Sequence, residues 1–206
     1  TGSSVTNLDQ IADHKGNVLL LLDSSWTIPI WEPADRFKAA GGKVVGVIYD
    51  LIPITHAHTS VHELTVLFKE WFMRHMSTSD GLIAISASVR NQIKDFAWER
   101  GRLDWCNPWA PIEYFHLGGD LDFRSAETKP SQRILEIFSS DVPTFLMVGT
   151  IEPRKMHRYV LEAFNLLWNG GDRVRLLILG RQAWKTEKLL EQIAQHPKLG
   201  VDLFVL

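Results

Sequence analysis

The sequence contains a single cysteine, Cys106. An internal disulfide is therefore excluded, as is a metal cage built from thiolates, and the reducing cytoplasm fits this composition best. No apolar run reaches the roughly 18–20 residues that span a bilayer, and the first residues lack the basic-then-apolar pattern of a secretion signal. We therefore expect a cytoplasmic protein without a membrane span.

Excess positive charge is also absent. The chain has 22 Lys and Arg residues against 24 Asp and Glu residues, which gives a formal net charge of −2 and a pI near 6.4. A protein that binds nucleic acid normally presents a basic face, so the charge balance argues against a nucleic-acid partner. The hydrophobic content of 45% is that of an ordinary globular protein.

Several well-known site motifs are missing as well. The sequence has no phosphate-binding P-loop, no dinucleotide GxGxxG and no serine nucleophile elbow. His56, His58 and His62 lie close together, but neither a cysteine nor a well-spaced carboxylate completes a metal-ligand set. We interpret these histidines as solvated or hydrogen-bonded side chains, and we predict no metal site.

Short apolar runs alternate with helical segments along the whole chain. Parallel strands buried on both faces have this continuous apolar character, which is clearest in residues 17–23, 43–50 and 145–148. No hairpin turn signal interrupts the alternation. The sequence therefore predicts an α/β fold with two Rossmann-like parallel-sheet units. The predicted strands are residues 17–23, 43–50, 81–86 and 112–117 in the first unit, and 144–148, 174–180 and 201–206 in the second.

The helix expected from residue 61 to residue 76 carries a stripe of large apolar side chains. Such a stripe can lie on a membrane surface or form a buried helix face. The opposite face carries Lys69, Glu70 and Arg74, a mixed set of charges rather than the cationic face of a membrane-surface helix. We therefore predict that the stripe packs into the core. Its members are Leu64, Leu67, Phe68, Trp71, Phe72 and Met76.

The segment FLMVGTIEPRKMH, residues 145–157, joins a strand to a helix through a glycine and two adjacent cations. A helix N-terminus offers free N–H groups and the positive end of the helix dipole, and Arg154 and Lys155 add charge. This arrangement suits a phosphate or diphosphate group. An ordinary βα connection with solvated charges fits these residues equally well.

Polar residues follow the strands of both units, where parallel sheets bind their ligands. Acidic residues, among them Asp23 and Asp50, follow strands of the first unit, and cations follow strands of the second. If the two edges face each other, they form a cleft with an acidic side and a cationic side.

Two groups of segments resemble one known family. VGTIEPRK, LLWNGG and LLILG resemble the second domain of family-four retaining glycosyltransferases of the two-Rossmann (GT-B) type. IYDLIPITH, DGLIAIS and FHLGGD resemble the later half of the first domain in the same bacterial polysaccharide and O-antigen branch. The resemblance implies that residues 1–120 are the later part of the acceptor-side domain, residues 121–142 a linker and residues 143–206 the first half of the donor-side domain. We also expect a fragment of a longer protein, because the run at 201–206 reads as a buried strand without its covering helix.

The resemblance assigns roles to particular residues. Backbone N–H groups with an arginine and a lysine hold the donor diphosphate in that family, which implies binding at Gly149, Thr150, Arg154 and Lys155. Lys155 matches the family lysine. Thr150 stands where the arginine often lies, and Arg154 is the candidate substitute. On the acceptor side, the implied catalytic residues are Asp23, at the position of a family histidine, with Asp50 and His56.

The implied activity is metal-independent transfer of a sugar, with retention, from a nucleotide-diphosphate donor such as GDP-mannose. No cofactor is implied, because the nucleotide sugar is a substrate. The expected acceptor is a glycan or lipid-linked glycan, which allows peripheral contact with the inner membrane. The family's Glu-x7-Glu motif does not occur in this sequence and is expected beyond Leu206. Two alternatives stay open, namely a non-catalytic transferase-like subunit and a sugar-nucleotide epimerase.

Overall fold

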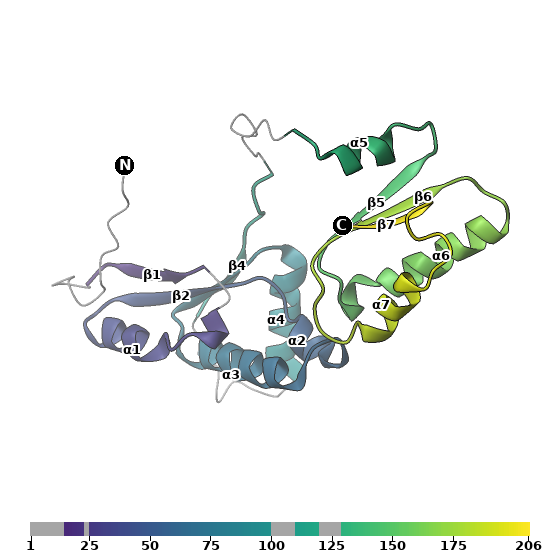
Figure 1. Ribbon diagram of the computed structural model, residues 1–206. Helices are drawn as coiled ribbons and strands as arrows, with labels where there is room; N and C mark the ends of the chain where they lie inside the picture. The colour runs from purple at the N-terminus through teal and green to yellow at the C-terminus, as the bar shows by residue number, and fades with distance from the viewer. Residues whose placement is uncertain (1–14, 23–24, 100–109, 120–128) are drawn as a thin grey trace. The chain divides into compact units, whose positions relative to one another are not determined.

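The computed structural model describes residues 15–22, 25–99, 110–119 and 129–206. The chain divides into two compact units, Thr1–Asp120 and Leu121–Leu206. Each unit is built on its own sheet, with four strands in the first and three in the second (Figure 1). All pairings between neighbouring strands are parallel. The predicted α/β fold with two Rossmann-like parallel sheets is confirmed.

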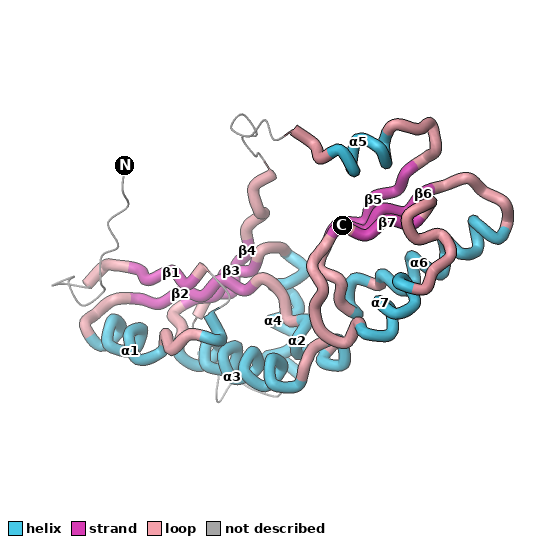
Figure 2. Tube along the Cα trace, in the orientation of Figure 1, coloured by secondary structure: helices cyan, strands magenta, loops and turns pink. Residues whose placement is uncertain are grey.

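Unit 1 contains a sheet with the strand order β1-β2-β3-β4, which is also the order along the chain. Its helices α1, α3 and α4 lie on one side of this sheet, and the opposite side carries no helix among the described residues (Figure 2). The strands are β1 (Val18–Leu21), β2 (Lys43–Ile48), β3 (Gly81–Ala84) and β4 (Ile112–Tyr114). The helices are α1 (Trp31–Ala39), α2 (Ile52–Thr55), α3 (His62–Thr78) and α4 (Ala87–Glu99), with short 3₁₀ turns η2 (Ser25–Thr27) and η3 (Ala57–Thr59).

The core of unit 1 is formed by the apolar stripe of α3 packed against the sheet. Phe68, Trp71, Phe72 and Met76 are all buried, and the edge of Phe96 from α4 packs against Phe72. The predicted core role of the stripe is therefore confirmed for these four side chains. Of the other two members, Leu64 is half-buried and Leu67 is 43% exposed.

His75 is the polar member of this buried layer and fixes how α3 crosses β2. Its Nδ1 lies 2.8 Å from Ser79 Oγ, and its ring packs edge-on against Trp31 and Trp71. A Cβ at Gly46 would stand 2.5 Å from His75 Nδ1, so the imidazole uses the space that the glycine leaves in β2.

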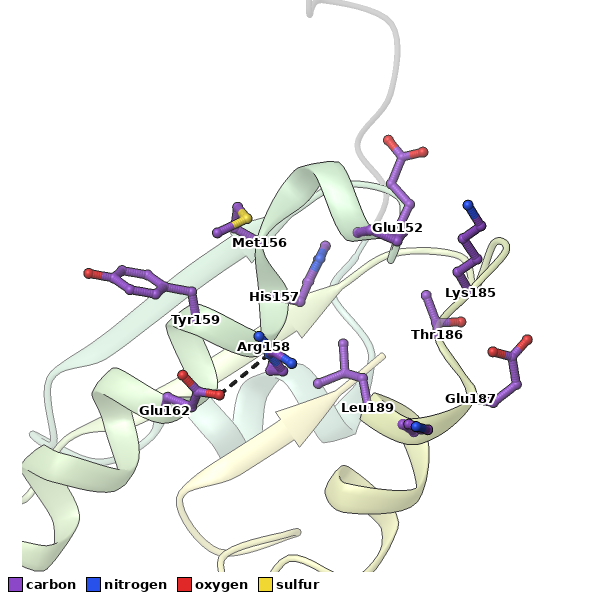
Figure 3. A pocket seen from close by; sticks show the side chains of 12 residues that line it. Glu152, Met156, His157, Arg158, Tyr159, Glu162, Lys185, Thr186, Glu187 and Leu189 are labelled. Carbon is purple, nitrogen blue, oxygen red and sulfur yellow. Dashed lines mark ion pairs between the residues drawn. The ribbon is translucent and has the colours of Figure 1, made fainter. Parts of the chain in front are cut away.

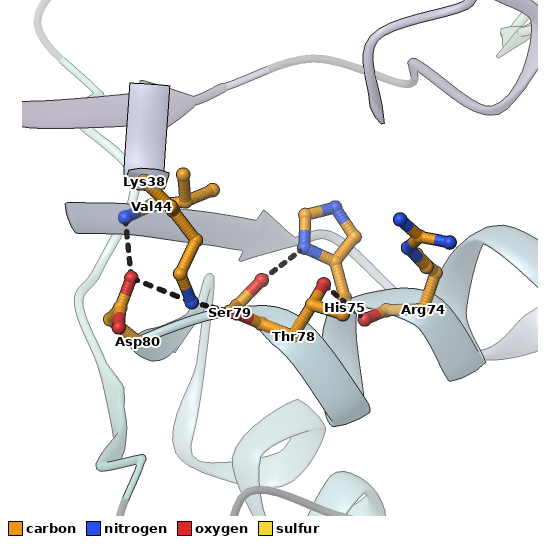
Figure 4. A network of polar contacts seen from close by, with 7 residues as sticks. All are labelled: Lys38, Val44, Arg74, His75, Thr78, Ser79 and Asp80. Atoms are coloured by element: carbon orange, nitrogen blue, oxygen red, sulfur yellow. Dashed lines mark hydrogen bonds and ion pairs between the residues drawn. The ribbon is translucent and has the colours of Figure 1, made fainter. Parts of the chain in front are cut away.

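Next to His75, a polar network ties the end of α3 to α1 and β2 (Figure 4). The Asp80 carboxylate accepts a hydrogen bond from the Val44 N–H at 2.8 Å and pairs with Lys38 Nζ at 3.1 Å. Lys38 Nζ also donates to the Thr78 carbonyl oxygen at the C-terminal end of α3. The free carbonyls of a helix end are thus partly satisfied by a cation, as the helix dipole favours.

Unit 2 contains a sheet with the strand order β5-β6-β7. Helices α6 and α7 lie on one side of it and α5 on the other (Figure 1). The core on the α6–α7 side includes Leu161, Phe164, Ile178, Ile193 and Leu203. The strands are β5 (Thr144–Val148), β6 (Arg175–Leu179) and β7 (Leu203–Val205), and the helices are α5 (Gln132–Phe138), α6 (His157–Asn169) and α7 (Glu187–Ala194), with the 3₁₀ turn η4 (Pro153–Lys155).

The prediction that the first strand of each unit is buried on both faces is wrong. Val18 of β1 is 57% exposed, and Phe145 and Val148 of β5 are 53% and 66% exposed. Among the described residues, both strands lie at the edge of their sheet, with one neighbouring strand each. In β1 the exposed Val18 and Leu20 alternate with Leu19 and Leu21, which pack against α1, so Val18 and Leu20 face the side of the sheet that carries no described helix. A continuous apolar run identifies a parallel strand. The position of that strand in the sheet depends on which other strands it pairs with, and the run does not specify them.

No helix in the described parts of the chain is both long and apolar enough to cross a membrane.

We expect the stability of unit 1 to fall as the pH is lowered from about 7 to about 4. Burial lowers the pKa of His75 from 6.5 to about 4, so between these values the unfolded chain binds a proton that the folded chain excludes. The loss is about 1.4 kcal/mol per pH unit in that window, on the order of 2–3 kcal/mol in total. Urea unfolding at a series of pH values, followed by hydrogen exchange of unit 1 amides, measures it.

His75→Phe should flatten the dependence of stability on pH, whereas the exposed control His62→Gln should not. An unchanged slope in His75→Phe would contradict the assignment.

Candidate functional site

The connection from β5 to α6, residues 149–157, is the segment for which the sequence predicts diphosphate binding, and it is called here the diphosphate loop. Its first residues continue the pairing of β5 with β6 beyond the regular strands. Gly149 N–H donates to the Leu179 carbonyl at 2.9 Å, and Ile151 N–H donates to the Arg181 carbonyl at 2.8 Å. Gly149 has a φ of 150°, a backbone conformation that L side chains rarely adopt. The loop therefore leaves the sheet at a defined point on its carboxyl edge.

Lys155 folds back over this glycine. Its Cε lies 4.0 Å from the position that a Cβ on Gly149 would take, while the side chain as a whole remains exposed. Met156 then adopts the left-handed conformation at φ 60° and leads into α6 without a side-chain cap. A lysine and an uncapped helix N-terminus thus lie within a few residues of each other at the strand end, which is the combination that binds phosphate groups.

Arg154, the second predicted cation, has a partner within the loop. Its Nη2 lies 2.5 Å from Glu152 Oε1, and Glu152 is only 5% exposed. A buried carboxylate needs such a partner, because removing its charge from water is costly. The structure therefore gives Arg154 a local structural role, whereas Lys155 extends over the strand glycine.

A pocket of about 550 Å³ lies beside the diphosphate loop, between the first turns of α6 and α7 (Figure 3). Its lining has three cations and three carboxylates: Arg158 pairs with Glu162 at 3.4 Å, Glu152 comes from the loop, and Lys185, Glu187 and Lys188 come from the α7 side. Neither Arg154 nor Lys155 lines it. The pocket is therefore not formed by the two cations of the loop.

His157 lies buried beneath the diphosphate loop, at the first position of α6. It is 1% exposed, and neither ring nitrogen has a hydrogen-bond partner among the described residues. Burial lowers the pKa of His157, with the nearby charge of Glu152 acting in the opposite sense and that of Lys155 in the same sense. A neutral imidazole therefore supports the loop at neutral pH and adds no charge to it.

Of the three acceptor-side residues predicted in unit 1, the structure describes Asp50 and His56. Asp50 directly follows β2, and its Oδ1 accepts a hydrogen bond from the Ile52 N–H at 2.9 Å, which caps α2. His56 ends α2 and is exposed, with its Nδ1 2.9 Å from Thr55 Oγ1 and its ring 6.1 Å from that of His58. Asp23 lies outside the described residues. The catalytic roles of all three stay predictions.

Sequence reasoning missed two parts of this site. It did not single out Glu152, because a glutamate before proline carries no signal that it will be buried. It noted Gly180 only as a strand end, although a Cβ there would stand 1.9 Å from the Gly149 carbonyl oxygen. Gly180 therefore sets the close approach of the two backbones on which the diphosphate loop rests.

Comparison with solved structures identifies the architecture. The structure of TarM aligns with 92% of this chain and 32% of its own length, with a TM-score of 0.56 and 11% sequence identity. A mutant of S. aureus TarM in complex with Fondaparinux, alpha-GlcNAc-glycerol and UDP aligns with a TM-score of 0.52 at 13% identity. The chain has GT-B-type Rossmann-like units. At these identities the likeness concerns the fold alone.

Sequence comparison adds a homologue of known activity. The chain is 36% identical over 177 residues, 84% of its length, to the serotype-specific mannosyltransferase WbdA of Escherichia coli, and two further WbdA sequences match at the same level. The chain spans about a fifth of the length of these curated relatives, because the matched region covers 21% of each. No family model matches the chain. The GT-B units are thus homologous to part of a mannosyltransferase.

We expect Arg154→Ala to destabilise unit 2 by about 1–2 kcal/mol, because it leaves the buried Glu152 carboxylate unpaired. The figure is below that for a fully buried pair, since the Arg154 side chain is 38% exposed and partly screened by water. Urea unfolding of unit 2 measures the loss. The double variant Glu152→Gln/Arg154→Ala should recover most of it. If Arg154→Ala were as stable as the native chain, the structural role of Arg154 would be wrong.

Proposed function

We propose that this chain is part of a retaining mannosyltransferase of glycosyltransferase family four. It transfers mannose from a nucleoside-diphosphate donor, GDP-mannose, to a glycan or lipid-linked glycan during assembly of a surface polysaccharide. The homology with WbdA supports the sugar, and the GT-B units support the use of a nucleotide-sugar donor. The resemblance to family-four enzymes supports retention and cytoplasmic action, at the periphery of the inner membrane.

The observation that carries the proposal is the position of Lys155 above Gly149 at the carboxyl edge of the unit 2 sheet. The diphosphate of the donor binds here, against the lysine ammonium and the N–H groups at the start of α6. As the bond to the anomeric carbon breaks, negative charge grows on the leaving diphosphate. Fixed positive partners stabilise that charge more in the transition state than in the ground state, which is the basis of electrostatic catalysis.

This arrangement provides the charge stabilisation from protein groups, and we propose that transfer needs no metal ion. Lys155 supplies a mobile ammonium, and the α6 N-terminus supplies oriented N–H groups that cost no reorganisation during the reaction. Arg154 stays paired with Glu152 and holds η4 in shape. In this proposal the loop contributes one direct cation, Lys155.

The acceptor binds at the carboxyl edge of the unit 1 sheet. Asp50 and His56 both follow β2, so they lie at the edge where parallel sheets bind their ligands. A carboxylate or imidazole at that edge can accept a hydrogen bond from the attacking hydroxyl and so orient it. Because Asp50 also caps α2, replacing it would affect the shape of this loop as well as the chemistry.

A second candidate is a non-catalytic transferase-like subunit that binds nucleotide sugars weakly. The pairing of Arg154 with Glu152, together with Thr150 in place of the family arginine, favours it because only one cation then faces the diphosphate. Product analysis with GDP-mannose and a mannan acceptor separates the two. Release of GDP together with an extended glycan supports the enzyme, whereas binding without turnover supports the subunit.

We expect Lys155→Ala to lower transfer by about 10²–10³-fold in the enzyme that contains this chain, because one fixed positive partner of the leaving diphosphate is lost. Turnover of GDP-mannose with an oligomannose acceptor measures the effect. The fold should survive, since Lys155 is exposed.

The matched control is Arg173→Ala, which removes an exposed cation near the start of β6, at the opposite end of the sheet from the diphosphate loop. It should leave transfer within about twofold of the native rate. Near-native turnover by Lys155→Ala, or an equal loss in both variants, would refute the assigned role of Lys155.

A further inference from the structure

Unit 1 carries a groove whose walls are largely aromatic, here called the tryptophan groove. It has a volume of about 370 Å³ and includes three of the chain's eight tryptophans, which come from three different elements. Trp26 comes from η2, Trp31 from the first turn of α1 and Trp71 from the middle of α3. The remaining lining residues are Ile28, Leu67, Glu70 and Arg74.

The aromatic walls of the groove are held rigidly. Trp71 donates its indole N–H to Ser25 Oγ at 3.0 Å, which fastens η2 to α3. Trp26 packs edge-on against both Phe68 and Trp71, with ring centroids 5.2 and 5.6 Å apart. Rigid aromatic surfaces lose little conformational entropy when a ligand binds, so the groove is preorganised.

The open side of the groove combines apolar and charged groups. Ile28 is 58% exposed and Leu67 is 43% exposed, so apolar surface faces solvent here. Arg74 lies over the Trp31 ring at 5.5 Å and is held by Asp35 at 2.6 Å, while Glu70 lies one helical turn before it and is exposed. A fixed guanidinium and a carboxylate thus border an apolar floor.

We propose that the tryptophan groove binds the pyranose rings of a glycan chain. A pyranose has an apolar face of C–H groups, which packs on indole and aliphatic side chains, and a rim of hydroxyls, which both donate and accept hydrogen bonds. Glu70 accepts from such hydroxyls and Arg74 donates to them. A lipid tail or an apolar helix would instead cover the Glu70 carboxylate without pairing it, which is unfavourable. Arg74 is already paired with Asp35.

This inference rests on the proposed function and deepens it. One wall of the groove is formed by η2 and the start of α1, which come directly after β1 in the sequence. This wall therefore lies near the carboxyl end of β1, at the carboxyl edge of the unit 1 sheet. When the terminal sugar of an acceptor chain reacts at that edge, the sugars next to it in the chain also contact the protein. The tryptophan groove holds these inner sugars of the chain, at a distance from the reacting hydroxyl, and so favours acceptors longer than one sugar.

The test is a titration of the protein with α-linked mannotriose, followed by tryptophan fluorescence and by the NMR signals of the indole N–H groups. The native protein should bind and shift the Trp26, Trp31 and Trp71 signals. Glu70→Gln should weaken binding about tenfold, because a hydrogen bond to a charged group is lost. Trp31→Leu should weaken it further.

The matched control is Glu63→Gln, which removes an exposed carboxylate from the first turn of the same helix, outside the groove. It should bind mannotriose as the native protein does. Because Glu70 is exposed, its replacement should leave the fold intact even if Trp31→Leu fails to fold. Equal affinity in Glu70→Gln and native protein, no saturable binding, or displacement of mannotriose by an apolar peptide but not by mannose would overturn the proposal.

A parallel titration with GDP separates this inference from the proposed function. If GDP binds and Lys155→Ala abolishes that binding, but mannotriose does not bind the groove, the glycan inference fails alone. If mannotriose binds through Glu70 while GDP does not bind, the groove proposal stands as a glycan-binding site and the donor assignment fails.

Discussion

A side chain cannot replace the hydrogen of Gly180, because a Cβ there would stand 1.9 Å from the Gly149 carbonyl oxygen. This contact lets the backbones after β5 and β6 run side by side beyond the regular strands, as the bonds from Gly149 and Ile151 show. The diphosphate loop takes its starting direction from this pairing. Lys155 can then fold over Gly149, and α6 begins close to the same point. The geometry of the candidate donor site thus depends on two glycines in contact.

Charge in the two units is used in different ways. Around the diphosphate loop, Arg154 neutralises the buried Glu152, and the exposed Lys155 is left for a ligand. In unit 1, Lys38 and Asp80 connect the end of α3 with β2, so those charges stabilise the layer of helices. Arg74 differs, because it is fixed beside Trp31 at the border of a groove. The buried or half-buried pairs around Glu152 and Asp80 thus set shape, whereas the candidate ligand contacts Lys155 and Glu70 are exposed.

The sequence predicts most of the fold because its signals are local. Apolar runs of strand length and helical periodicity can each be recognised from residues that are close together in the sequence. The run of residues 43–50, for example, appears as the buried strand β2. The stripe at Phe68, Trp71 and Phe72 appears as core for the same reason. The burial of the first strand in each unit was predicted wrongly, because it depends on the strand order and on which face of the sheet a helix covers, and no local pattern encodes either.

For the candidate site, the sequence by itself determined the parts: a glycine at a strand end, two cations and a helix start within residues 149–157. Only the tertiary structure decided how these parts are used. It paired Arg154 with Glu152, buried His157 beneath the loop and set Gly180 against Gly149. It also gathered Trp26, Trp31 and Trp71 from separate elements into one groove. Each of these outcomes depends on contacts between distant residues, which no local pattern of residue types specifies.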